Sequence, residues 1–186
     1  LKALLPGGYV NFRGPTISFE NAAYFPKVDP IPIWHGGGAV YNQETDQMEL
    51  VMSAMRRVAR WCTGWVPNGT HSPKLIAEGT QTIKELAREY GRGNLNLETV
   101  ANLLMFLDDD NVAKKKVRRS LEALGVSVEH GIADQLVGSV ETAVRTVEAY
   151  QEAGATTIVM QCWAENLESF VRMMRVFAQE VAPRFQ

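Results

Sequence analysis

The chain has 186 residues, of which 46% are hydrophobic and 22% are charged, the proportions of an ordinary globular domain. Its 19 basic and 21 acidic side chains give a net charge of −2, too balanced for a protein that binds nucleic acid through a basic surface. Cys62 and Cys162 form no CxxC pattern and no apolar leader opens the chain, so we expect a cytoplasmic protein without a disulfide or zinc site.

The first 30 residues differ from the rest because prolines and glycines interrupt them. These breakers are Pro6, Gly7, Gly8, Gly14, Pro15, Pro26 and Pro30. They predict an irregular excursion over residues 1–30 with at most a short hairpin around residues 10–19. Because the chain starts at Leu1 and not at Met, we expect it to be a piece of a longer protein.

From residue 31 onward, short apolar runs alternate with helical patterns, which is typical of βα units around a parallel sheet. The first unit has a strand over residues 31–35, followed by three glycines and a helix. The apolar positions of that helix are Met48, Met52, Met55, Val58, Ala59 and Cys62. The second unit has a strand over residues 64–68 and a helix that Ser72 caps and Gly91 ends.

The third unit has a strand over residues 99–107 and a helix that Gly125 ends. Between them lies the acidic run 108–110, which we interpret as helix capping because carboxylates stabilise the positive end of the helix dipole. The basic run 114–119 is interrupted by apolar residues at helical spacing, so we interpret it as a solvated helix face.

Residues 126–137 have weak periodicity and predict no regular element. Ser139 then caps a helix, and a strand rich in β-branched residues follows over residues 156–161. A last amphipathic helix runs to Pro183. No apolar run approaches the roughly 20 residues of a membrane span, so we expect no membrane partner.

These four units predict an α/β fold that forms the C-terminal half of a (β/α)8 TIM barrel, with about four parallel strands and flanking helices over residues 31–186. Half a barrel leaves two sheet edges and an apolar inner face uncovered. We therefore expect an N-terminal barrel half or a second copy of the chain to cover them, and a homo-oligomer such as a dimer.

Four stretches, in this order, resemble the C-terminal half of luciferase-like flavin-dependent monooxygenases and oxidoreductases. They are residues 30–38 (PIPIWHGGG), 57–67 (RVARWCTGWVP), 137–141 (VGSVE) and 150–155 (YQEAGA). The chain departs from the family pattern at Thr63, where an aspartate is usual, and at His35, where an aliphatic residue is frequent. About ten extra residues around positions 41–47 also lengthen the loop after the glycines.

The resemblance implies an enzyme that uses a flavin, either FMN or the deazaflavin coenzyme F420, to oxidise a small organic substrate. In the family the first four strands carry much of the flavin ring pocket and the substrate contacts. Those strands would lie before Leu1, so the catalytic residues are not assigned within this chain.

Gly36, Gly37 and Gly38 are the first cofactor-binding candidates, because glycines at a strand end let backbone N–H groups approach a phosphate. Asn68 ends the next strand, where the family often places a small polar side chain near the same phosphate. Trp65 could form a wall of the flavin pocket. A tight βα turn, an Asn-Gly turn and a packed core tryptophan are the structural alternatives.

The three histidines share no metal-ligand spacing, and the chain has no P-loop and no nucleophile elbow. The leading hypothesis is therefore a flavin-dependent oxidoreductase to which this chain contributes the cofactor phosphate side. A noncatalytic half-barrel that self-associates through its open sheet is the alternative. Another phosphate-binding barrel enzyme is a third hypothesis.

Overall fold

The computed structural model describes residues 4–5, 7–27, 31–45, 47–67, 71–123, 132 and 134–185. The chain divides into two units, Leu1–Ile33 and Trp34–Gln186, which are described separately. In the first unit, β1 (Val10–Arg13) and β2 (Ser18–Ala22) form an antiparallel hairpin. The rings of Phe12 and Phe19 stack with their centroids 5.5 Å apart across this hairpin.

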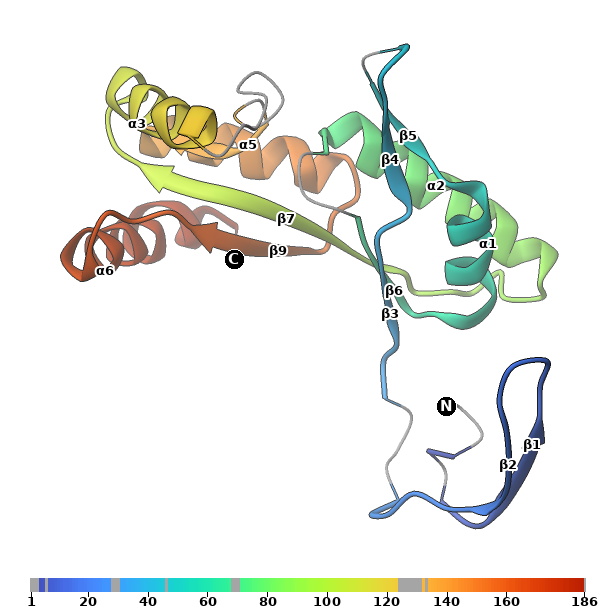
Figure 1. The fold of residues 1–186 in the computed structure, drawn as a ribbon. Helices are drawn as coiled ribbons and strands as arrows, with labels where there is room; N and C mark the ends of the chain where they lie inside the picture. The colour runs from blue at the N-terminus through green and yellow to red at the C-terminus, as the bar shows by residue number, and fades with distance from the viewer. Residues whose placement is uncertain are drawn as a thin grey trace. The chain divides into compact units, whose positions relative to one another are not determined.

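The second unit contains a parallel sheet with flanking helices, which confirms the predicted α/β class (Figure 1). Its strands are β3 (Trp34–Gly36), β6 (Gly64–Val66), β7 (Glu98–Leu107), β8 (Leu136–Gly138) and β9 (Thr157–Cys162). The strand order is β3-β6-β7-β8, and β9 pairs with β7 as well. The long strand β7 is therefore the central strand, with which three of the other four strands pair.

Strand β7 has three partners, which pair with different stretches of it except at Met105, where β8 and β9 both pair. Strand β6 pairs with Glu98 and Thr99, β8 pairs with residues 105–107, and β9 pairs with residues 100–105. The N–H of Leu104 donates to the side-chain Oε1 of Gln135 at 2.7 Å, next to the start of β8. This side chain extends the hydrogen bonding of β7 where β8 has not yet begun.

Within the described residues, five α-helices flank the sheet, and none of them could span a membrane. They are α1 (Met52–Trp61), α2 (Pro73–Glu89), α3 (Asp110–Ala123), α5 (Val140–Glu152) and α6 (Leu167–Val176). Ser72 and Ser139 cap α2 and α5 as predicted, accepting from the N–H groups of Leu75 and Thr142. The Asp109 carboxylate caps α3 in the same way, accepting from the N–H groups two and three residues later.

The predicted helix that began at Met48 is wrong at its start. Residues 39–50 form the antiparallel hairpin β4 (Ala39–Asn42) and β5 (Gln47–Leu50), and Met48 lies in β5. Gln47 to Leu50 alternate polar and apolar residues, the period of a half-buried strand. Met48 stands four residues before Met52, which is also a helical spacing, so Met48 was wrongly included in the predicted helix.

Two further boundaries differ from the prediction. The short strand β8 begins inside the segment predicted to be irregular, because its three residues are too few to show a period. Pro183 lies inside a final 3₁₀-helical turn, Ala182–Phe185, instead of ending the helix before it. The predicted helix end at Gly125 lies outside the described residues.

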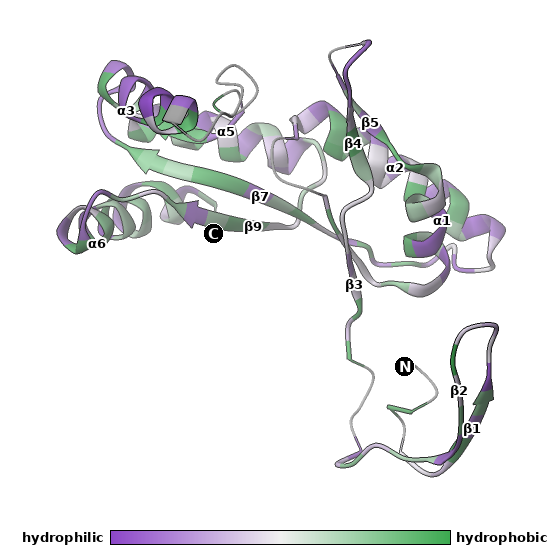
Figure 2. Ribbon diagram, viewed as in Figure 1, coloured by the Kyte–Doolittle hydropathy of each residue, from purple (hydrophilic) through white to green (hydrophobic). Residues whose placement is uncertain are grey.

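The two faces of β7 are buried to different degrees. Its odd-numbered residues are all buried; they are Thr99, Ala101, Leu103, Met105 and Leu107. On the opposite face, Asn102 and Leu104 are only half-buried, and Val159 on β9, the cross-strand partner of Asn102, is 43% exposed. Figure 2 shows that β7 stays hydrophobic towards its end. We call the face of Asn102, Leu104 and Val159 the open face.

Trp65 fixes α2 against the sheet. Its indole is fully buried, and a Cβ atom at Gly79 of α2 would collide with the six-membered ring of the indole. Glycine normally weakens a helix interior by about 1 kcal/mol relative to alanine. The close approach of the indole explains why this helix carries one.

We expect Gly79→Ala to lower the free energy of unfolding by roughly 1–3 kcal/mol, because overpacking outweighs the gain in helix propensity. Urea denaturation of the chain measures the change. Gly93→Ala is the matched control, since a Cβ there would meet only the Arg88 side chain, at 3.6 Å. Equal stability of the two variants would contradict the packing described for Trp65.

Candidate functional site

The three predicted glycines form a turn at the carboxyl end of β3. Gly37 and Gly38 have φ angles of +92° and +94°, in the region that favours glycine. The N–H of Gly37 donates to the carbonyl of Val66 at 2.8 Å, which extends the pairing of β3 with β6 by one residue. A Cβ atom at Gly36 would meet no atom within 4 Å, so there is open space beside the backbone at this residue.

Trp65 lies beneath this glycine turn. Its Nε1 donates to the carbonyl of Gly37 at 2.8 Å, and a Cβ atom at Gly38 would lie 3.3 Å from the same nitrogen. Because Trp65 is fully buried, its ring supports the turn from the helix side of the sheet. The structure thus brings together four of the predicted site residues, whereas Asn68 lies outside the described residues.

The inserted hairpin begins and ends beside the glycine turn. Ala39 pairs with Leu50, and the N–H of Val51 donates to the carbonyl of Gly38 at 2.9 Å. The first turn of α1 therefore follows Gly38 in space although 12 residues lie between Gly38 and Val51 in the chain. The hairpin thus leaves the N-terminus of α1 next to Gly38.

The first turn of α1 has no capping group of its own. Val51 makes no side-chain cap, the turn contains no acidic residue, and the N–H groups of Met52 and Ser53 donate to none of the described residues. Ser72, Asp109, Ser139 and Asn166 cap the other four α-helices that the structure describes. Free N–H groups at the positive end of a helix are a binding site for an anion.

The N-terminus of α5 already holds an internal anion. Asp110 Oδ1 accepts from the N–H of Ser139 at 2.6 Å and from the hydroxyl of Thr142 at 2.9 Å. These hydrogen bonds, the Ser139 N–H first, hold the pKa of Asp110 below its usual value. A Cβ atom at Gly138 would collide with this carboxylate, so the close approach needs a glycine. A phosphate would find this helix N-terminus occupied.

His35 lies next to the glycines but faces the helices. It pairs in register with Trp65, and residues paired across parallel strands share one face of the sheet. Burial, with a smaller effect of the Arg57 charge, lowers the pKa of the His35 imidazole. The described residues contain no group of three His, Cys, Asp or Glu side chains that could hold a metal ion.

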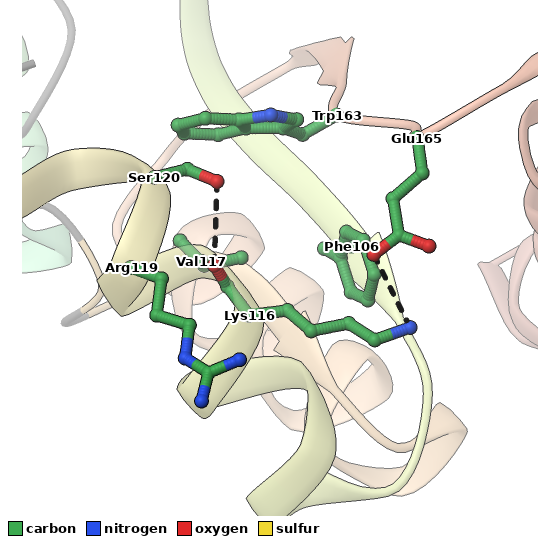
Figure 3. A pocket seen from close by; sticks show the side chains of 7 residues that line it. All are labelled: Phe106, Lys116, Val117, Arg119, Ser120, Trp163 and Glu165. Carbon is green, nitrogen blue, oxygen red and sulfur yellow. Dashed lines mark hydrogen bonds and ion pairs between the residues drawn. The ribbon is translucent and has the colours of Figure 1, made fainter. Parts of the chain in front are cut away.

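A pocket of about 230 Å³ opens at the carboxyl ends of β7 and β9 (Figure 3). Its lining residues are Phe106, Lys116, Val117, Arg119, Ser120, Trp163 and Glu165. Lys116 and Arg119 belong to the basic run predicted as a solvated helix face, and no sequence motif includes Trp163. The signal available was the position of Trp163 directly after a strand, where barrel enzymes place functional side chains.

Neither family sequence models nor characterised proteins match this chain by sequence. Its fold, however, is similar to that of solved enzymes. Over 100% of this chain and 58% of the other, it superposes with a TM-score of 0.77 and 15% identity on an F420-dependent secondary alcohol dehydrogenase in complex with an F420-acetone adduct.

Two monooxygenases are similar as well. For one from Streptomyces bottropensis the TM-score is 0.74 and the identity 18%, over 100% of this chain and 58% of that one. For the oxygenating constituent of 3,6-diketocamphane monooxygenase from Pseudomonas putida, in complex with FMN, the values are 0.62 and 15%, over 100% and 60%. The likeness supports the predicted α/β fold of parallel strands with flanking helices. The chain spans about three fifths of these structures.

We expect Asp110→Asn to lower the free energy of unfolding near neutral pH by roughly 1 kcal/mol, as for the loss of a helix cap. Because the folded-state pKa of Asp110 is lowered, its contribution is complete above about pH 4 and is lost as the pH falls through the folded pKa. The stability difference between Asp110→Asn and the unaltered chain should therefore shrink between about pH 4 and pH 2.

Urea denaturation at several pH values measures this difference. Glu141→Gln is the control, since it removes another acid from the first turn of α5 that makes none of these hydrogen bonds. A deficit of Asp110→Asn that stays constant down to pH 2 would contradict the role given to the carboxylate.

Proposed function

We propose that the chain is part of a flavin-dependent oxidoreductase or monooxygenase of the luciferase-like family, with FMN or coenzyme F420 as its cofactor. The observation that carries the proposal is the fold likeness along the whole chain to enzymes that are named for F420 or hold FMN. The cofactor would supply the hydride or electron transfer. The residues of this chain would bind its phosphate and orient it.

The glycine turn and the first turn of α1 fit a phosphate group. The open space beside the backbone at Gly36 leaves room, and the N–H groups of Met52 and Ser53 are available as donors. Because no acidic side chain lies in this first turn, nothing there repels an anion. Gly37 would act differently from the original expectation, since its N–H is already bonded to Val66.

The remaining two candidates have distinct roles in this proposal. Trp65 would hold the shape of the glycine turn through its hydrogen bond to the Gly37 carbonyl, without touching the cofactor. Asn68 follows β6 in the chain, at the carboxyl end of the strand next to the glycines. We keep it as a proposed phosphate contact on the strength of that position.

The phosphate contact is tested by comparing FMN with riboflavin, which lacks the phosphate. We expect the chain to bind FMN at least tenfold more tightly than riboflavin, because the ring contacts are assigned to the N-terminal half. Ser53→Glu should abolish this preference because its carboxylate repels the phosphate. Ser53→Glu should not harm folding, since an acid in the first turn favours the helix dipole. Equilibrium dialysis measures both affinities.

Ser53→Gln is the matched control, because it has nearly the same size without the charge. It should keep the preference for FMN. Equal binding of FMN and riboflavin by the unaltered chain would overturn the proposed phosphate site. The same dialysis with F420 in place of FMN decides which of the two cofactors the chain prefers.

We also propose that the open face and one side of α6 are covered by an N-terminal barrel half, which would carry the flavin ring contacts and the catalytic residues. Leu167 and Val171 of α6 are 76% and 42% exposed. On the open face, Val159 of β9 is 43% exposed. Exposed apolar surfaces are typical of a face that a partner covers.

Without that half, we expect the chain to self-associate at micromolar concentration and to bind a hydrophobic dye, because exposed apolar side chains favour association. Leu167→Glu should shift the chain towards monomer in sedimentation. Val112→Glu is the control, because Val112 is an exposed apolar residue of α3 and belongs neither to α6 nor to the open face. A well-folded monomer without dye binding would count against the uncovered surface and against the half-barrel alternative built on it.

A further inference from the structure

The pocket between α3 and the end of β9 has the features of a ligand site. Phe106 is the last open-face residue of β7, and Trp163 directly follows β9. The backbone N–H of Trp163 donates to the carbonyl of Met105 at 2.9 Å. This bond fixes the backbone that carries the indole. Figure 3 shows the indole across one side of the pocket, with its ring face turned towards Ser120 of α3.

The charges of the pocket do not cancel. Lys116 Nζ lies 3.5 Å from a carboxylate oxygen of Glu165 and 3.9 Å from one of Asp108. The carboxylates of Glu165 and Asp108 therefore neutralise the charge of Lys116. Arg119 is exposed and forms no ion pair with the described residues, and Figure 3 shows its guanidinium on the side of the pocket away from Trp163. One positive charge thus remains available to a ligand.

We propose that this pocket binds a planar aromatic carboxylate of one or two rings. The ring would stack on Trp163, because aromatic faces prefer stacked or edge contacts. The carboxylate would accept hydrogen bonds from Arg119, whose planar guanidinium matches a carboxylate in geometry. The pocket of about 230 Å³ has room for a ligand of this size. The identification of this ligand as the enzyme's substrate rests on the proposed function, whereas its binding does not.

Glu165 sets the affinity of the site in this proposal. Its carboxylate neutralises Lys116, whose ammonium also lies 5.6 Å from the centre of the Phe106 ring. If Glu165 lost its charge, Lys116 would become a second cation for the ligand. A site for an anion should therefore bind more tightly when this rim acid is removed, which a merely structural ion pair would not cause.

The test titrates the 186-residue chain with 2-naphthoate and with the neutral 2-naphthamide, without any flavin, using calorimetry. We expect naphthoate to bind about tenfold more tightly than the amide, and Arg119→Gln to remove this difference. Arg118→Gln is the matched control, a neighbouring exposed arginine that does not line the pocket. Glu165→Gln should tighten naphthoate binding severalfold and leave the amide unchanged. Trp163→Leu should weaken both ligands.

Equal affinity for the acid and the amide, equal effects of the two arginine variants, or no binding of either ligand would overturn the inference. Circular dichroism of each variant shows whether the fold is kept; Arg119 and Glu165 are exposed, so their variants should fold. Naphthoate binding together with loss of the FMN preference would count against the proposed function alone. Loss of naphthoate binding with an intact FMN preference would count against this pocket alone.

Discussion

The buried indole of Trp65 joins the sheet, a helix and the glycine turn in one contact. Its ring packs on Gly79 of α2, and its N–H holds the carbonyl of Gly37. Because the ring is fully buried, a movement of α2 would be transmitted to the turn. The glycine turn then determines where the carbonyl of Gly38 accepts from the N–H of Val51, and so where α1 begins. The candidate phosphate site thus depends on core packing.

Sequence patterns predicted the elements whose signals are local. Ser72 and Ser139 were identified as caps because each stands just before a run with apolar residues at helical spacing. A short hydroxyl side chain at that position accepts from a free N–H group of the first turn. The long strand β7 was predicted within one residue at its start because both its faces are apolar. The hairpin β4–β5 and the three-residue strand β8 escaped because their pairing partners, not their own periods, define them.

The candidate site was predictable in part for the same reason. Glycines at a strand end can be read from the sequence, so Gly36 to Gly38 were predicted there. Trp65 was singled out as well, although its hydrogen bond to the Gly37 carbonyl has no signal in the sequence. The environment of Lys116 could not be read, because its partners Asp108 and Glu165 lie 8 and 49 residues away along the chain. The uncapped start of α1 could not be predicted either. Nothing in the sequence marks Val51 as the residue before the helix, and only the structure shows that its N–H bonds to the carbonyl of Gly38.

The hairpin β4–β5 is closed at its base, where Ala39 meets Leu50 and Val51 meets Gly38. This makes it a removable module: its length is uncoupled from the geometry of the backbone that it interrupts. Relatives with shorter or longer segments at this point could keep the same turn, because an added or deleted pair of residues moves only the tip. The base of the hairpin is accordingly a natural graft point, at which a foreign loop can be exchanged while α1 keeps its start.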